Sequence, residues 1–479
     1  MTSFDVHVFG IRTYAGKIRT THTVRWQVSG RQLQRTFDTR KLADSFRSTL
    51  LAATNSGQPF DEGSGLPVTH ARGQSGPGWL AHAAEFVDTK WPRASARHRR
   101  GIAEGLTTAT CGLLPPRMQT QPVRQALRDW AFNTAARSST ALALEDLPEW
   151  AQILSTINRL LPTIDQLAQP VRLNQMVDAV SKNLDGGFAS PSTTARKRSA
   201  LYGALTYAVE MGHLTANPMD RLSSPRSRQL EVIDRRVVVN PDQARQLLAA
   251  VAEIYPALEA FFGCMYYAAL RPAEVRHLTI DDLLLPADPT MWGTLLLSGS
   301  TQTGGRAWTD GGVRDEDRAL KHRARRATRR VPAPPELVQL LHRHVQLFPP
   351  GVGGRLFVNR VGRAGIPVAA PYASAQSMGI VYRVWDRARS QVFNEIQYAS
   401  VLAKRPYDLR HAAVSLWLNA GVPATQVAEW AGHSVNVLLR VYASCVVGQD
   451  EAARQRVDAA LRESTTLGHN PQISPLFPQ

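Results

Sequence analysis

The chain has 479 residues, which is more than one hydrophobic core usually contains, so we expect about three domains. Hydrophobic residues make up 43% of the chain and charged residues 20%, a composition that excludes an intrinsically disordered protein. The formal net charge of +17 argues against an enzyme of small metabolites and favours a polyanionic partner such as nucleic acid.

The cysteines and the apolar segments indicate where the protein works. Cys111, Cys264 and Cys445 are far apart and odd in number, which fits neither a disulfide framework nor a zinc site. The N-terminal residues lack the layout of a signal peptide, and the longest apolar run, residues 257–270, is too short to span a bilayer. We therefore expect a protein of the reducing cytoplasm, associated with the bacterial nucleoid and without a membrane partner.

The first 60 residues predict a small unit of three strands and one helix. Residues 4–12 and 22–37 have the alternation of short strands, with glycines at the turns. Thr39 then opens an amphipathic helix. The following residues 61–78 are rich in glycine, serine and proline, which predicts a linker.

From residue 79 to residue 222 the hydrophobic residues recur with the period of helices, which predicts a helical second domain. Its expected core anchors are Trp79, Phe86, Trp91, Leu127, Trp130 and Tyr202. Arg196, Lys197 and Arg198 precede the apolar stripe of one helix and are candidates for DNA contact. A solvated helix face explains these three charges equally well.

The arginine-rich residues 223–239 predict a second linker. Asn240 and Pro241 then supply an N-cap and a proline at the first helical position, so a third domain is expected over residues 240–460. Within it, helices flank a β-region around residues 293–332, and residues 461–479 form a tail. The expected fold class is α+β, mainly helical with small β elements.

Four short segments of this third domain stand out together. They are ALRPAE at residues 269–274, RPYDLRH at 405–411, AGHS at 431–434 and RVYA at 440–443. In their order and spacing they resemble the catalytic motifs of the tyrosine recombinases and integrases, whose pattern is A-L-R-x-x-E, then H-x-L-R-H, then L-G-H-S and a final tyrosine. The upstream helical region and the small N-terminal β-unit also resemble the DNA-binding layout of phage-type integrases, with residues 1–60 as an arm-site domain.

The resemblance implies a DNA-breaking and rejoining enzyme that acts through a 3′-phosphotyrosyl intermediate. Tyr442 would be the nucleophile, and Arg271 and Arg410 would stabilise the charge that builds on the phosphate oxygens. His433 would donate a hydrogen bond to a phosphate oxygen, and Glu274 would orient Arg271. In this family a lysine on a β-hairpin protonates the departing 5′ oxygen, and Lys321, which precedes a turn and the strand expected at 328–332, is the candidate rather than Lys404.

Several nearby residues have more than one interpretation. Tyr407 departs from the family pattern, which has histidine there, and it can donate a hydrogen bond but cannot become cationic. We place it in the catalytic set as a donor to the phosphate, and the alternatives are a competing nucleophile or a buried ring with a satisfied hydroxyl. His411 is a supporting residue whose role is structural or catalytic. Arg325, Arg326, Arg329 and Arg330 follow Lys321 and fit a solvated charge run, but their closeness to the expected active site favours phosphate contact, and Arg323, Arg325 and Arg326 are candidates for DNA binding. The long stretch 299–318, with Trp308, either folds over the site or forms a surface excursion.

The partners follow from the same resemblance. Double-stranded DNA is expected at core sites and at arm sites, with a homotetramer on DNA, residues 443–461 docking on a neighbouring subunit, and accessory DNA-bending and directionality factors. Integration or excision of a mobile element is the expected role. No sequence motif for ATP or metal binding is present, so no cofactor is expected.

Two other functions remain open. Residues 408–419 and 423–431 flank a short turn like that of a helix-turn-helix, which is compatible with a DNA-binding regulator without catalysis. A type IB topoisomerase or a hairpin-forming resolvase would share the tyrosine chemistry but not the exchange of strands between two sites.

Overall fold

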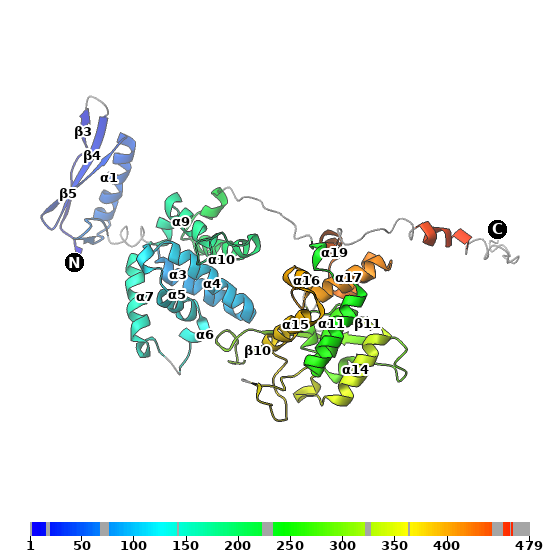
Figure 1. Ribbon diagram of the computed structural model, residues 1–479. Helices are drawn as coiled ribbons and strands as arrows, with labels where there is room; N and C mark the ends of the chain where they lie inside the picture. Colours follow the sequence, from blue (N-terminus) through cyan, green and yellow to red (C-terminus); the bar gives the residue numbers. More distant parts are fainter. Residues whose placement is uncertain are drawn as a thin grey trace, which may run out of the picture. The chain divides into compact units, whose positions relative to one another are not determined.

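The computed structural model describes residues 2–15, 20–67, 76–140, 143–222, 233–320, 327–362, 365–442, 454–459 and 461–462. The chain divides into two compact units. The first comprises Met1–Arg226 together with Gly305–Gly312, and the second comprises Ser227–Gly304 and Val313–Gln479. Both are built mainly from helices with small antiparallel sheets, which confirms the predicted α+β class (Figure 1).

The N-terminal part of the first unit is a small antiparallel sheet covered on one face by a helix (Figure 1). Strands β2 (Val6–Val8) and β3 (Arg12–Ala15) pair with successive parts of one edge of β4 (Thr20–Val28), and β5 (Arg31–Phe37) pairs with the other edge. Helix α1 (Arg40–Asn55) begins at its N-cap Thr39, as the sequence predicts. Short strands β1 (Thr2–Ser3) and β6 (Phe60–Asp61) pair beside this sheet.

Alternating residues of β4 fix the buried face of this sheet. Val24, Trp26 and Val28 point to one side and form a core with Ala43 and Leu50 of α1. The opposite face carries the intervening polar residues, because side chains alternate across a strand.

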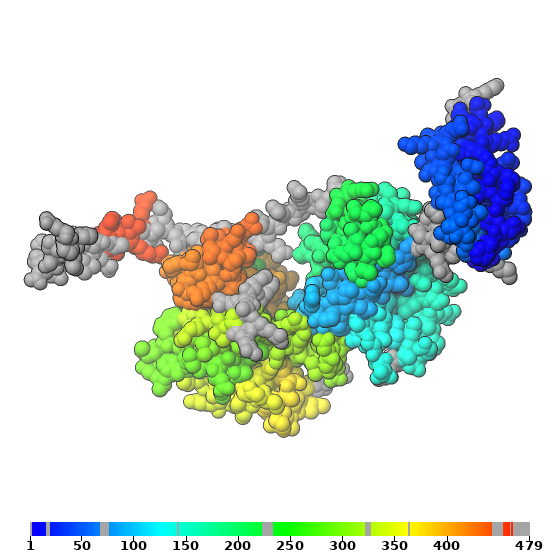
Figure 2. All heavy atoms as spheres, turned by 180° about the vertical axis from the view of Figure 1, so that it is seen from behind, coloured from blue at the N-terminus to red at the C-terminus, as the bar shows by residue number. Residues whose placement is uncertain are grey.

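The rest of the first unit is a helical bundle. Its helices are α3 (Trp79–Lys90), α4 (Ala96–Gly112), α5 (Gln121–Gln125), α6 (Thr134–Arg137), α7 (Pro148–Leu160), α8 (Ile164–Leu167), α9 (Pro170–Val180) and α10 (Pro191–Glu210), with a π-helical turn at Ala126–Ala131. Helix α10 packs on α4, so segments far apart in the chain lie side by side (Figures 1 and 2). The approach is close, because a Cβ added to Gly105 would lie 2.8 Å from the Cβ of Ala200.

Most of the predicted anchors lie in the bundle core. Trp79, Phe86, Trp91, Leu127 and Trp130 are buried in one cluster, as expected. The prediction for Tyr202 was wrong. Its side chain is 44% exposed on α10, and its hydroxyl donates a hydrogen bond to Asp220 at 3.0 Å. A tyrosine satisfies its ring and its hydroxyl at the surface as readily as in a core.

Residues 305–312 belong to this bundle, although in the chain they lie between two segments of the second unit. Trp308 is only 6% exposed and packs against Trp91, with 5.9 Å between ring centroids. The buried guanidinium of Arg99 binds Asp310 through two hydrogen bonds of 2.6 and 3.1 Å and also donates to the carbonyl oxygen of Trp308. The segment is therefore part of a hydrophobic core, which corrects the expectation of a cover over the site or a surface excursion.

The second unit consists of helices around a three-stranded sheet and a two-stranded hairpin. The helices are α11 (Pro241–Ile254), α12 (Glu259–Tyr267), α13 (Pro272–Val275), α14 (Pro335–Leu347), α15 (Met378–Val392), α16 (Glu395–Ala399), α17 (Asp408–Asn419), α18 (Ala424–Ala431) and α19 (Val435–Tyr442). The sheet has the order β11 (Arg329–Ala333), β8 (Gly293–Leu297), β7 (Leu283–Leu284), and β9 (Gly299–Thr303) pairs with β10 (Asp315–Ala319). All these pairings are antiparallel.

Several local predictions are confirmed in this unit. Asn240 caps α11 through a capping box with Gln243, and Pro241 occupies the first helical position. Helix α12 ends at Tyr267, before the apolar run does, and Ala269 adopts a left-handed conformation with φ of 51°. Helices α17 and α18 flank a turn at Gly421, as the helix-turn-helix comparison anticipated. No helix among the described residues is long and apolar enough to cross a membrane.

Candidate functional site

The site begins at the junction between α12 and α13. Arg271 precedes α13, and its backbone N–H donates to Glu274 Oε2 at 2.9 Å. Its guanidinium donates to Glu274 Oε1 at 2.8 Å and to the carbonyl oxygen of Gly432 at 2.8 Å. Burial alone would lower the pKa of Arg271, but the ion pair with Glu274 outweighs it and raises the pKa. The side chain keeps 21% of its surface exposed, so it can reach a bound ligand.

Arg410 comes from α17 and is completely buried. It donates hydrogen bonds to the carbonyl oxygens of Ala269 and Ala431 and to Nε2 of His433, the last at 2.7 Å. The left-handed backbone at Ala269 thus turns a carbonyl toward this guanidinium. Burial and the neighbouring Arg271 lower the pKa of Arg410, because both disfavour a second positive charge there.

A third arginine completes this group. Arg329 of β11 binds Glu274 through two hydrogen bonds of 3.1 and 2.9 Å, and both side chains are almost fully buried. Burial would raise the pKa of Glu274, but Arg329, Arg271 and Arg410 lower it to about 2. Glu274 therefore stays ionised between two guanidinium groups. The interpretation of Arg329 as part of a solvated charge run was wrong, whereas Arg330 is exposed.

Sequence reasoning did not identify this ion pair. The strand pattern contained a signal, because Arg329 shares the inward face of β11 with Val331 and Ala333. A charged residue on the buried face of a strand needs a buried partner. The partner itself, 55 positions earlier in the chain, could not be found from that pattern.

Helix α18 ends at Ala431, and its C-cap residue Gly432 turns the chain so that His433 lies beside the arginines. Gly432 is left-handed, with φ of 64°, and a Cβ there would collide with Nη1 of Arg329. His433 Nε2 accepts from Arg410, and since a guanidinium only donates, the ring proton of neutral His433 lies on Nδ1. Burial and then Arg410 lower the pKa of His433 to about 3, so the ring is neutral. Its buried Nδ1 has no hydrogen-bond partner among the described residues.

Three aromatic rings adjoin this group. Tyr442, the last described residue of α19, is 0% exposed, and its hydroxyl lies 3.0 Å from Nδ1 of His411. The ring of His411 lies between those of Tyr407 and Tyr442, with centroid separations of 5.1 and 5.7 Å. The ring of His433 is 6.1 Å from that of Tyr442. Burial and then Arg410 and Arg405 lower the pKa of His411 to about 4.

The structure thus brings seven of the predicted residues into one neighbourhood. They are Arg271, Glu274, Tyr407, Arg410, His411, His433 and Tyr442. Lys321, Arg323, Arg325 and Arg326 lie outside the described residues. Arg196, Lys197 and Arg198 belong to α10 of the first unit, where Arg196 is exposed and the other two are half-buried. Burial lowers the pKa of Lys197.

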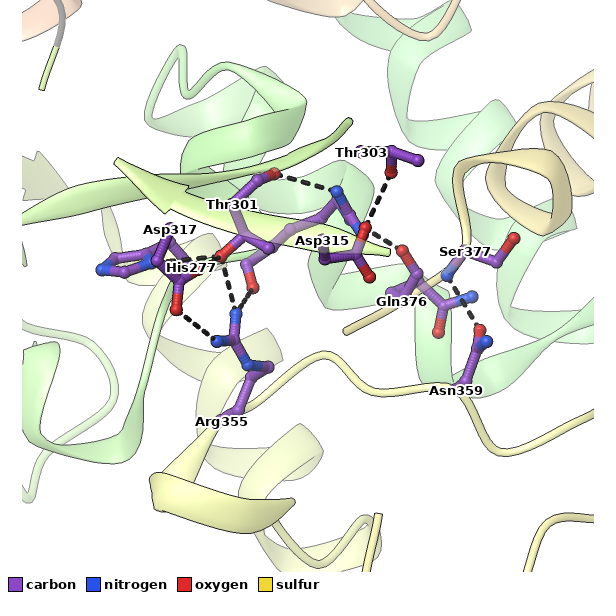
Figure 3. Close-up of polar contacts among 10 residues, drawn as sticks. His277, Thr301, Thr303, Asp315, Asp317, Arg355, Asn359, Gln376 and Ser377 are labelled. Carbon is purple, nitrogen blue, oxygen red and sulfur yellow. Dashed lines mark hydrogen bonds and ion pairs between the residues drawn. The ribbon is translucent and has the colours of Figure 1, made fainter. Parts of the chain in front are cut away.

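A second polar network anchors the β9–β10 hairpin, which precedes Lys321 (Figure 3). Arg276 donates to the carbonyl oxygens of Gln376 and Thr301 and to Asp315 Oδ1, at 2.7 to 2.9 Å. Arg355 donates to Thr301 Oγ1 at 2.8 Å and to Asp317 at 3.2 Å.

The same network joins the hairpin to the segment after α13. Nδ1 of His277 lies at hydrogen-bond distance from Thr301 and Asp317. The hydrogen bonds that His277 and Thr301 make to Asp317, with the charge of Arg355, hold the pKa of Asp317 far below its usual range. Arg276 and His277 follow α13 directly. The hairpin is therefore fixed to the segment of chain that carries Arg271. Among the described residues, no group of three or more His, Cys, Asp or Glu side chains is arranged to hold a metal ion.

Comparison with known protein families and with curated protein sequences finds no match. Comparison with solved structures finds similar chains. The Tn1549 transposon integrase, in complex with a circular intermediate DNA, has 17% identity and a TM-score of 0.42, and the match covers 71% of this chain and 98% of that one. The XerH site-specific recombinase bound to difH has 14% identity and a TM-score of 0.44, covering 78% and 94%.

Lambda integrase, as a tetramer bound to a Holliday junction, has 14% identity and a TM-score of 0.40, covering 88% of this chain and 95% of that one. All three TM-scores lie below 0.5.

Proposed function

We propose that this protein is a tyrosine recombinase that cuts and rejoins DNA at specific sites. The observation that carries the proposal is the convergence of Arg271, Arg410 and His433 beside Tyr442, from segments far apart in the chain. The two guanidinium groups would hold the scissile phosphate and stabilise the negative charge that develops on its oxygens. No regulator without catalysis needs a tyrosine hydroxyl beside this group.

Charge balance supports a phosphate as the ligand. Among the described residues, the guanidinium groups of Arg271 and Arg329 bind one carboxylate, a third, of Arg410, acts on it through its charge without binding it, and both histidines near them have lowered pKa values. The excess positive charge is buried, where its attraction for an anion is strong. Nδ1–H of His433 lacks an acceptor in the described part of the chain and could donate to a phosphate oxygen.

The proposed reaction begins with attack of the Tyr442 oxygen on the phosphorus, which forms a 3′-phosphotyrosyl bond and releases a 5′ hydroxyl. Lys321 is our candidate for the acid that protonates the departing 5′ oxygen. A 5′ hydroxyl of another strand then reverses the step and joins the strands. Because Tyr442 is fully buried, we expect DNA binding to move α19 or the residues around it before attack.

The test recovers the DNA site and the covalent adduct together. The full-length protein is incubated with a random-sequence duplex library that carries sparse nicks. Where a nick lies near the cleavage point, the short fragment that carries the freed 5′ hydroxyl diffuses away and rejoining is prevented. DNA that stays linked to protein in detergent is recovered and sequenced. Wild-type protein should give an adduct on Tyr442 by peptide mapping, and Tyr442→Phe should give none. Tyr407→Phe is the matched control and should keep the adduct on Tyr442.

The outcomes separate the proposal from its rivals. An adduct that survives Tyr442→Phe would remove Tyr442 as nucleophile, and sequence-specific binding without any adduct would indicate a regulator. A protein that forms the adduct and relaxes supercoiled DNA, but never joins strands of two recovered sites, would indicate a topoisomerase. Exchange between two such duplexes supports a recombinase, with mobile-element integration as the proposed role and a tetramer as the proposed assembly.

We also propose a second DNA contact, at an arm site, on the outer face of the N-terminal sheet. Opposite the face covered by α1, the strands present Arg12, Arg25, Gln32 and Gln34, all exposed. Arginine and glutamine are side chains that read guanine and adenine in the major groove. The double variant Arg25→Ala/Gln34→Ala should lose protection of a second DNA sequence in footprints. Arg40→Ala, on α1, should retain it, and equal loss in both would remove this proposal.

A further inference from the structure

A residue one position after Arg410 contacts the atom that would react. Tyr407 is the N-cap residue of α17 and His411 lies four positions later, so their rings contact each other on one side of the helix start. Nδ1 of His411 is 3.0 Å from the Tyr442 hydroxyl, which is hydrogen-bond distance. The ring of Tyr407 contacts that of His411, and the ring of His433 contacts that of Tyr442.

We propose that His411 is the general base that accepts the proton of Tyr442 as its oxygen attacks the DNA phosphate. This inference rests on the function proposed above and adds a residue to its chemistry. The hydroxyl proton moves to Nδ1 of His411, the tyrosine oxygen bonds to phosphorus, the bond from phosphorus to the 5′ oxygen breaks, and that oxygen takes a proton from Lys321. In rejoining, a 5′ hydroxyl attacks the phosphorus and gives its proton to Lys321, the bond from phosphorus to the Tyr442 oxygen breaks, and the imidazolium of His411 returns its proton to that oxygen.

The chemistry of the neighbourhood assigns this role to His411 rather than to another group. Tyr407 occupies the position where the resemblance expects a histidine, and a phenol does not accept a proton readily. Nε2 of His433 already accepts from Arg410 at 2.7 Å. Arg405 and Arg410 are the other charged groups beside His411, and neither can act as a base. His411 therefore supplies a neutral acceptor at hydrogen-bond distance from the Tyr442 hydroxyl.

The bound phosphate would itself strengthen this base. Burial and then the charges of Arg410 and Arg405 keep His411 neutral in the DNA-free protein, with a pKa of about 4. A neutral imidazole is the form that can accept a proton. A phosphodiester against Arg271 and Arg410 offsets the positive charge that lowers the basicity of His411, so the imidazolium becomes easier to form once DNA is bound. The base is thus held ready and strengthened by its substrate.

The first experiment measures single-turnover formation of the Tyr442 adduct between pH 5 and pH 10, on a DNA recovered by covalent capture. His411→Asn keeps a polar group near the position of Nδ1 but cannot accept a proton. At pH 7 it should react about 10²–10⁴-fold more slowly than wild type. Its rate should rise about tenfold per pH unit toward the ordinary pKa of tyrosine, about 10, where the phenolate forms without help. Wild type should stay nearly flat from pH 6 to pH 9.

The matched control is His344→Gln. His344 is another buried histidine with its pKa lowered to about 4, but its Nε2 lies 3.3 Å from the carbonyl oxygen of Leu356 in the core. Its variant should keep the wild-type pH profile. If His411→Asn matches wild type, or is slower by one factor at every pH, the base is not His411. In that case the wild-type adduct still stands, so the proposed recombinase function survives the failure of this inference.

A second substrate separates the base from the acid. With a 5′-bridging phosphorothiolate the leaving group is a thiolate, which departs without a proton. Lys321→Ala should then recover cleavage, whereas His411→Asn should remain slow because Tyr442 still has to lose its proton. Recovery of His411→Asn on this substrate would assign His411 to the leaving-group side and overturn the proposal.

A third measurement uses wild-type protein without DNA and does not depend on a variant that folds. The proposal requires the Tyr442 hydroxyl to donate to Nδ1, so the ring proton of His411 must lie on Nε2. Nitrogen-15 NMR of histidine-labelled protein at pH 7 should show a neutral ring with an unprotonated Nδ1, assigned through His411→Asn or through its coupling to Tyr442. A proton on Nδ1 would contradict the proposal.

Discussion

Two buried polar clusters in the second unit differ in their balance of charge. Around Arg276, two arginines face two aspartates, and every nitrogen of the Arg276 guanidinium has an acceptor (Figure 3). Around Glu274, two arginines share one carboxylate among the described residues while the charge of Arg410 also acts on it, and Nε of Arg329 and of Arg410 has no acceptor there. The balanced cluster is complete by itself. We propose that an anion completes the unbalanced cluster, a difference that would separate structural from functional arginines.

The largest expected effect is on the balanced cluster. Arg276→Leu removes a guanidinium that is 2% exposed and leaves Asp315 without its ion-pair partner. Removing one member of a buried ion pair typically costs about 3–5 kcal/mol of stability. Chemical denaturation should therefore show the transition of the second unit at a clearly lower denaturant concentration. Arg330→Leu, at an exposed position of β11, is the control, and an equal shift in both variants would deny Arg276 a special role.

The unbalanced cluster should respond in the opposite way. Arg410→Gln is expected to lower the rate of adduct formation about 10²–10³-fold, the usual cost of losing one donor to a transition-state oxyanion. Its stability should change by less than that of Arg276→Leu, because loss of three hydrogen bonds is offset by relief of repulsion from Arg271. Destabilisation as large as that of Arg276→Leu would make Arg410 a structural residue, and the comparison would fail.

The sequence predicted those features that depend on neighbouring residues, namely the start of a helix and short catalytic motifs. The caps at Thr39 and Asn240 depend on hydrogen bonds within one turn, so they could be predicted from a few residues. The residues around the site could be proposed because four short segments match one pattern. Their meeting in space was an expectation from resemblance, and the positions of Arg271, Arg410 and His433 agree with it.

The rest depended on contacts that no local pattern contains. The pairing of Arg329 with Glu274 joins two elements that lie 55 positions apart in the chain. Tyr202 fits the apolar stripe of a helix, but the hydroxyl found a partner at the surface. The contact between His411 and Tyr442 joins two helices and depends on the angle between them, so the sequence could rank His411 only as a supporting residue.

The position of Trp308 in the first unit determines when, during synthesis of the chain, the helical bundle can complete its core. N-terminal regions generally begin to fold while the ribosome is still making the rest of the chain. Here residues 79–222 emerge well before residues 305–312, which supply Trp308 to the core and Asp310 to the buried guanidinium of Arg99. Until the β9–β10 hairpin has been translated, the bundle therefore lacks one tryptophan of its core, and one buried cation lacks its counter-ion.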